Sequence, residues 1–92
     1  MKVASYKTLT SSGAVLAEGG YFIAVVLTGG SDAATVTLYD NASAASGNVI
    51  CKLGAAAGAS ASFAPGAAVK VANGIYAALS GTGVSVSVIY AP

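Results

Sequence analysis

The sequence predicts an all-β protein, an antiparallel β-sandwich with jelly-roll character built from about eight short strands. Three observations predict this class. Apolar residues recur with a period of two, which is typical of strands and not of helices. Gly-Gly pairs and an Asn-Gly dipeptide separate the apolar runs. Most connections between runs are about two to seven residues long, as expected for antiparallel neighbours.

The whole chain, 1–92, is expected to form a single β-sandwich domain, because 92 residues suit one domain and no linker divides them. The expected strands lie near residues 2–10, 14–17, 20–28, 34–40, 48–53, 67–73, 75–80 and 83–90. Alternation is clearest in the last run, where Val84, Val86, Val88 and Tyr90 share one face.

Two other runs alternate in the same way. In 34–40, Ala34, Val36 and Leu38 oppose the side that carries Thr35, Thr37 and Tyr39. In 75–80, Ile75, Ala77 and Leu79 oppose Tyr76 and Ala78, and in 67–73 Val69 and Val71 are expected inward and Lys70 outward.

Residues 20–28 are apolar on both faces, with Tyr21, Ile23, Val25 and Leu27 against Phe22, Ala24 and Val26. A strand of this kind is expected at the centre of a sheet and covered on both sides. A neighbouring subunit would supply the second cover.

Two connections carry specific expectations. Asn73-Gly74 predicts a two-residue type I′ hairpin, because both central residues of that turn need a positive φ. Residues 54–66 are mostly Ala, Gly and Ser, and we expect an irregular loop that crosses between sheets with Phe63 as its anchor in the core. A single helical turn at 55–57 is the alternative for its first part.

Charged residues make up 8% of the chain, against roughly 25% in ordinary soluble domains, and the net charge is +1. His, Arg and Trp are absent. We therefore expect no nucleic-acid partner, no cofactor and no enzymatic activity. The chain contains no run of about 18 apolar residues, so no membrane span is predicted. Lys7 interrupts the region after Lys2, so no signal peptide is expected.

The few reactive side chains predict no catalytic or metal site. Asp32 and Asp40 bracket one expected strand, which separates them by roughly 26 Å, too far for a carboxylate pair. Glu18 and Asp32 are interpreted as solvated turn residues, and Asp40 as an Asx-type turn that closes its strand. Cys51 is expected to be a small buried hydrophobe, and a chain without disulfides fits a reducing cytoplasm.

Low charge with high mean hydropathy, +0.77, favours assembly, because subunits with few charges pack without desolvating ions. We expect a homo-oligomer, with a trimer favoured, whose interface uses the neutral second faces of strands. The interface candidates are Phe22, Val26, Tyr39 and Tyr76.

Two stretches carry a family resemblance. The first runs Ala34-Thr35-Val36-Thr37-Leu38-Tyr39-Asp40-Asn41, a small-residue loop to Gly47, then Val49-Ile50; the second is 73–81 followed by 84–90. Together they resemble small virion structural proteins of tailed bacteriophages, some of which are head decoration (cement) proteins and others tail or fibre proteins. The resemblance implies a sandwich or jelly-roll subunit, often trimeric, that binds and stiffens the capsid and carries no catalytic residues.

The sequence therefore predicts a non-enzymatic capsid decoration protein that binds the major capsid protein or a neighbouring virion protein. It would be made in the host cytoplasm and reside in the virion. A tail or fibre component and a self-assembling shell or filament subunit are the alternatives within the structural class. A small ice- or carbohydrate-binding module is a third, suggested by Thr35-Val36-Thr37 and by exposed tyrosines.

Overall fold

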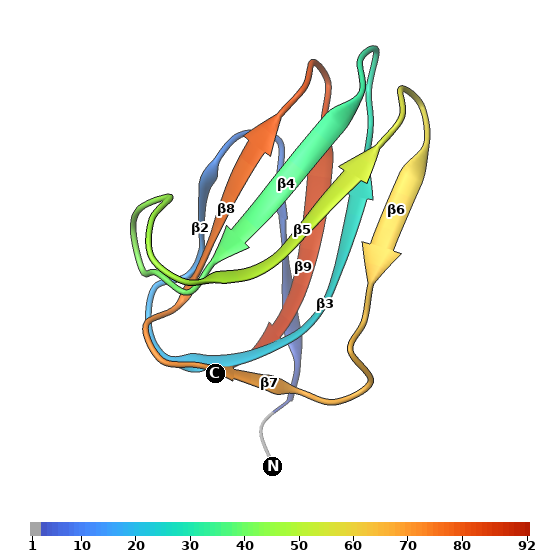
Figure 1. The fold of residues 1–92 in the computed structure, drawn as a ribbon. Coiled ribbons are helices and arrows are strands. Elements are labelled where there is room, and N and C mark those ends of the chain that lie inside the picture. The colour runs from blue at the N-terminus through green and yellow to red at the C-terminus, as the bar shows by residue number, and fades with distance from the viewer. Residues whose placement is uncertain (1–2) are drawn as a thin grey trace.

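A computed structural model describes residues 3–92 and shows nine strands in two packed antiparallel sheets (Figure 1). The strands are β1 (Ser5–Leu9), β2 (Gly13–Leu16), β3 (Gly20–Thr28), β4 (Ala34–Tyr39), β5 (Val49–Ala55), β6 (Ser60–Phe63), β7 (Val69–Val71), β8 (Ile75–Ser80) and β9 (Ser85–Ala91). The first sheet has the order β1-β9-β3-β6, with β7 also paired to β3, and the second sheet has the order β2-β8-β4-β5. The predicted all-β sandwich is confirmed.

The strand order is that of a jelly roll. β6 and β7 pair with successive parts of β3, so together they act as one strand that is interrupted at 64–68. Counted in this way, the first and last strands are neighbours in one sheet, and the chain passes between the sheets at nearly every connection. In the β1–β9 pair, Ser5 lies opposite Tyr90.

The core lies between the sheets and is built by the alternation that the sequence shows. Ala34, Val36 and Leu38 of β4 are buried, and so are Ile75 and Ala77 of β8. The first sheet contributes the other wall, whose fully buried members include Val25, Leu27, Val86 and Val88. These faces are confirmed, and side chains that branch at Cβ fit the pleated surface they cover.

β3 is central, as predicted, but its inner face does not follow strict alternation. The register between β3 and β9 shifts between Phe22 and Ala24, which marks a β-bulge. The bulge turns Phe22 to the same side as Val25 and Leu27, and all three are 0% exposed. The expectation that Phe22 lies on the face opposite to Val25 is therefore wrong, because one extra residue in the strand changes the side on which later residues fall.

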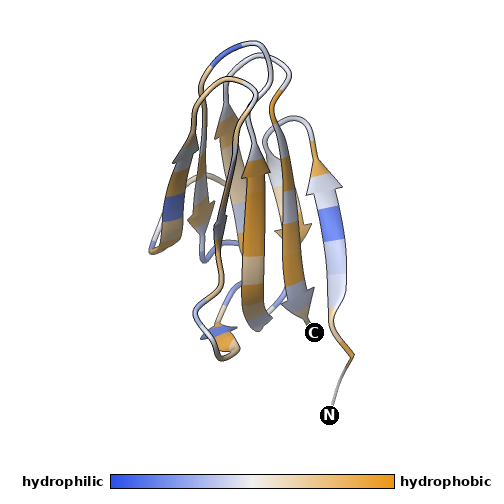
Figure 2. Ribbon diagram, turned by 90° about the vertical axis from the view of Figure 1, so that its right-hand side faces the viewer, coloured by the Kyte–Doolittle hydropathy of each residue, from blue (hydrophilic) through white to orange (hydrophobic). Residues whose placement is uncertain are grey.

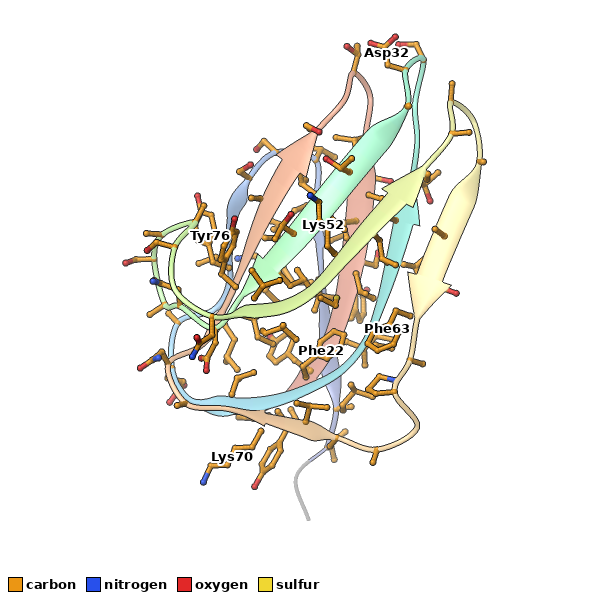
Figure 3. All side chains as sticks on the ribbon, in the orientation of Figure 1. Phe22, Asp32, Lys52, Phe63, Lys70 and Tyr76 are labelled. Atoms are coloured by element: carbon orange, nitrogen blue, oxygen red, sulfur yellow. The ribbon has the colours of Figure 1, made fainter. Side chains whose placement is uncertain are left out.

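Residues 54–66 are not one irregular loop. β5 continues to Ala55, residues 57–58 form a turn, and β6 then pairs with β3 from Thr28↔Ser60 to Val25↔Phe63. No helical turn forms at 55–57. Phe63 faces inward at the margin of the core, where it remains 41% exposed and stacks on Phe22 with 6.3 Å between ring centroids (Figure 3).

Asn73-Gly74 does not form a hairpin. β7 pairs with β3 in the first sheet and β8 with β4 and β2 in the second, so the dipeptide carries the chain from one sheet to the other. Gly74 has φ +147°, but among residues 3–92 no residue other than glycine has a positive φ, which rules out a type I′ turn. A Cβ at Gly74 would overlap the carbonyl oxygen of Leu16, so the glycine is required by close packing.

The loops at one end of the sandwich are tied together through Gly29 and Gly30. Gly29 N–H donates to Ala59 O at 2.8 Å, and Gly30 O accepts from Gly58 N–H at 2.9 Å. A Cβ at Gly30 would overlap the carbonyl oxygen of Thr82. The glycine pair therefore lets the β3–β4, β5–β6 and β8–β9 loops pack side by side (Figure 1).

Candidate functional site

The outer face of the first sheet is broad and is lined mainly with small hydroxyl side chains. Across the strands, Val26 of β3 lies between Ser87 of β9 and Ser62 of β6, and in the next row Thr28 lies between Ser85 and Ser60. Val26 is 40% exposed at the centre of this surface. We call the surface formed by the outward residues of β1, β9, β3 and β6 the hydroxyl face; they are Tyr6, Thr8, Ser85, Ser87, Ile89, Tyr21, Ala24, Val26, Thr28, Ser60 and Ser62.

Hydroxyl groups on this face satisfy one another across strands. Thr8 Oγ1 and Ser87 Oγ are 2.9 Å apart, and Thr28 Oγ1 and Ser60 Oγ are 3.3 Å apart. Within each pair, each hydroxyl group has a hydrogen-bond partner other than bulk water. Covering such a surface with another protein costs less than covering unpaired polar groups.

Charge is kept off the hydroxyl face. β9, β3 and β6 contain no Lys, Arg, Asp or Glu. Lys7 of β1 faces the inner side, where its Nζ donates to Ala14 O at 3.1 Å, and Lys70 of β7 lies outward only at the margin, beside Tyr21. Figure 2 shows the strand that rises from the N-terminus as pale with one blue band, next to strands that are mostly orange. The surface can therefore be desolvated without stripping water from an ion.

The outer face of the second sheet brings two predicted interface residues together. Tyr39 of β4 and Tyr76 of β8 are register partners, so their side chains leave the sheet side by side, and both are partly buried. On β5, the strand on the other side of β4 from β8, Val49 is the register partner of Tyr39 and is 55% exposed. Lys52 lies beside Thr37 in the middle of this face, so a partner here would meet a charge (Figure 3).

The four predicted interface residues do not form one surface. Val26 lies on the hydroxyl face, and Tyr39 and Tyr76 lie on the opposite side of the sandwich. Phe22 is 0% exposed between the sheets and contacts Phe63, so its side chain belongs to the core of the subunit and is not available to a partner. The bulge in β3 is the physical reason for its position.

Two exposed tyrosines were not among the residues predicted from the sequence. Tyr6 is 73% exposed on β1, beside Ile89 on the hydroxyl face, and Tyr21 is 40% exposed on β3. The period of two in 2–10 and 20–28 carries the relevant signal, because it places Tyr6 with Thr8 and separates Tyr21 from Phe22.

The acidic residues do not gather. Asp32 and Asp40 lie at opposite ends of β4. Asp40 accepts hydrogen bonds from the backbone N–H groups of Ala72 at 3.2 Å and Asn73 at 2.9 Å. The Asx turn predicted for Asp40 belongs instead to Asn41, whose Oδ1 accepts from Ser43 N–H at 2.9 Å. Among residues 3–92, no three His, Cys, Asp or Glu residues lie close enough to hold a metal ion.

Cys51 packs against the margin of the core and is only partly buried, so the expected buried position is met in part. Burial raises the pKa of its thiol. The neighbouring Lys52 leaves the opposite face of β5, so it supplies no cation to stabilise a thiolate.

A shallow apolar groove lies where the first sheet is interrupted. It has a volume of about 320 Å³ and is lined by Ile23 and Ala24 of the β3 bulge and by Ala64, Gly66, Ala67 and Ala68. No charged side chain lines it, and it continues the neutral character of the hydroxyl face toward β7.

Comparison with protein-family models, curated proteins and solved structures found no match. In the part of the chain that the structure describes, no helix is long and apolar enough to span a bilayer.

Proposed function

We propose that this chain is a non-enzymatic structural subunit of a bacteriophage virion that binds the head as a homo-oligomer and stabilises it. The jelly-roll architecture is compatible with such a role, since viral capsid domains use the same strand arrangement. Fold alone does not assign function, so the proposal depends on the surface.

The observation that carries the proposal is the hydroxyl face. Three of its four strands, β9, β3 and β6, carry no charge, its hydroxyl groups are partly paired among themselves, and Val26 is exposed at its centre. Protein interfaces are depleted of charge at their core for the same reason, because buried ions are costly.

The partner we propose is the major capsid protein, displayed many times on a head. The rows around Val26 carry small side chains and offer no deep anchor, so each contact is expected to be weak. Several linked copies that engage equivalent sites would raise the effective concentration of the remaining sites and give tight binding overall. A docking face that makes weak contacts therefore suits a partner that is repeated many times on a head better than it suits a single soluble partner.

The proposal is tested by adding purified protein to undecorated phage heads and then applying heat or osmotic shock. We expect saturable binding and a higher rupture temperature. Val26→Asp would place a charge at the centre of the hydroxyl face and abolish binding. The matched control is Thr35→Asp, which introduces the same charge at an exposed position of the opposite sheet and should leave binding intact.

Other outcomes would replace the proposal. Copurification with tails or fibres in place of heads would assign the chain to those structures. Open-ended growth of the purified protein would indicate a shell or filament subunit. Binding to ice or to a glycan with comparable affinity, and none to heads, would contradict the virion role.

A further inference from the structure

The edges of the two sheets differ in how they are protected against pairing with another chain. An edge strand exposes unpaired backbone groups, and proteins commonly block such edges with lysines or bulges. Lys7 lies on β1, Lys52 on β5 and Lys70 on β7, and all three strands are edges. β2, the remaining edge of the second sheet, is bulged between Ala14 and Leu16.

β6 is the edge strand that has neither protection. Its residues are Ser60, Ala61, Ser62 and Phe63, without a charge, and its register with β3 is regular. Ser60, Ser62 and Phe63 are exposed. Every lysine within residues 3–92 lies on an edge strand, and β6 differs from the other edges in that it has neither a lysine nor a bulge.

The hydrogen-bond pattern shows which backbone groups of β6 are free. Gly29 N–H donates to Ala59 O at 2.8 Å, one step beyond the Thr28↔Ser60 pair. Antiparallel pairs alternate between hydrogen-bonded and non-hydrogen-bonded. Ala61 and Phe63 therefore bond to β3, and the N–H and C=O groups of Ser60 and Ser62 point away from it, toward the open edge.

We propose that the open edge of β6 pairs with β6 of a second copy of this chain, antiparallel and across a two-fold axis at Ala61. In this register Ser60 faces Ser62 of the second copy and Ser62 faces its Ser60. The pairing forms about four backbone hydrogen bonds. It is self-complementary, as a two-fold interface requires, and joins the first sheets of both copies into one continuous sheet.

Apolar side chains beside this edge add area to the contact. Phe63 and Val69 are each 41% exposed on the inner side of the interrupted strand. Because β6 has only four residues, the interface is small and the dimer is expected to be weak in solution. The inference rests on the proposed function in one respect, namely that copies of this chain act together, and it names the contact that joins them.

The two-fold pairing would place two hydroxyl faces in one plane. A dimer would then present two equivalent docking surfaces to a repeated lattice, which supplies the multivalency that weak contacts need. In this proposal a two-fold dimer takes the place of the trimer expected from the family resemblance.

Sedimentation velocity of the full chain from about 1 μM to several hundred μM tests the pairing. We expect a reversible monomer–dimer equilibrium for the natural sequence. Ser62→Pro removes the N–H that points to the open edge and spares the bonds to β3, so it should raise the dimer dissociation constant at least about tenfold. Ser62→Ala, the matched control, keeps that N–H and should dimerise as the natural chain does.

A second variant protects the test against misfolding of Ser62→Pro. Ser62→Lys copies the protection found on the other edges and should also weaken the dimer at least about tenfold, with an unchanged circular dichroism spectrum. The pairing would be overturned by a natural chain that stays monomeric at every concentration or forms a discrete trimer, or by a Ser62→Lys variant that dimerises equally well. A trimer that still protects heads would overturn the β6 pairing but leave the proposed function standing.

Discussion

Asp40 and Asn73 hold each other at the point where the chain passes between the sheets. Oδ1 of Asp40 accepts from the backbone N–H of Asn73 at 2.9 Å, and Nδ2 of Asn73 lies 3.4 Å from the carbonyl oxygen of Asp40. Asp40 follows β4 of the second sheet, and Asn73 follows β7 of the first. The contact therefore joins the end of one sheet to the connection that leaves the other.

Removing the Asp40 carboxylate should destabilise the protein. Asp40→Ala leaves the N–H groups of Ala72 and Asn73 without their acceptor and should lower the free energy of unfolding by about 1–2 kcal/mol. Chemical denaturation measures the change. Asp32→Ala, at the opposite and exposed end of β4, is the control and should change it by less than about 0.5 kcal/mol. Equal effects at the two positions would show that the Asp40 contacts contribute nothing specific.

Gly74→Ala should destabilise strongly, for a reason other than a hairpin. The new Cβ would overlap Leu16 O at a residue with φ +147°, so the backbone must shift, at a cost above about 2 kcal/mol. Gly66→Ala provides the comparison, because Gly66 has φ +86° but open space around its Cβ position. It should cost only about 1 kcal/mol. Melting temperatures that fall by the same amount in both variants would contradict the close contact.

Phe22→Asp and Val26→Asp should separate folding from docking. Phe22 is 0% exposed, so a carboxylate there is buried without a partner, and we expect loss of the folded β-sheet spectrum by circular dichroism. Val26 is 40% exposed, so its variant should keep the fold and lose binding to heads. A folded Phe22→Asp protein, or a Val26→Asp protein that still binds, would refute these assignments.

Cys51 should react more slowly in the folded protein than in the unfolded chain. The thiolate is the reactive form, and burial raises the pKa of this thiol, so less thiolate is present at a given pH. As pH rises, the thiol of the unfolded chain ionises before the thiol of the folded protein. The Cys51 thiol therefore contributes to the stability of the native state below its ordinary pKa. This contribution is lost as pH rises through the raised pKa of the folded protein. Alkylation followed by mass spectrometry, with and without urea, should place the midpoint of the native rate at the higher pH. Coincident midpoints would contradict burial of the thiol.

Much of the fold can be predicted from the sequence because large branched side chains mark it clearly. Val84, Val86 and Val88 and the run from Ala34 to Tyr39 show their buried faces by alternation alone. β6 was not predicted because Ser60, Ala61 and Ser62 differ too little in hydropathy to show a period. The Asn73-Gly74 prediction was wrong because a local turn preference does not reveal that the flanking strands belong to different sheets.

The candidate surface is less predictable than the core. Alternation correctly placed Tyr39 and Tyr76 on an outward face, and their adjacency then follows from the β4–β8 register, which a sequence does not show. The position of Phe22 depends on a bulge, and nothing in the apolar run 20–28 marks the extra residue. Pairing of hydroxyls such as Thr8 and Ser87, which are far apart in the chain, likewise emerges only when the strands are assembled.

The pairing of Ser5 with Tyr90 has a consequence for engineering. The start of β1 and the end of β9 lie at the same end of the sandwich (Figure 1), so a linker of a few residues could join Pro92 to Val3 without crossing either sheet. New termini would then open within the exposed segment 43–48, which contributes to no strand. A circular permutant of this design keeps every strand whole, and its closure entropy is small because the linker is short.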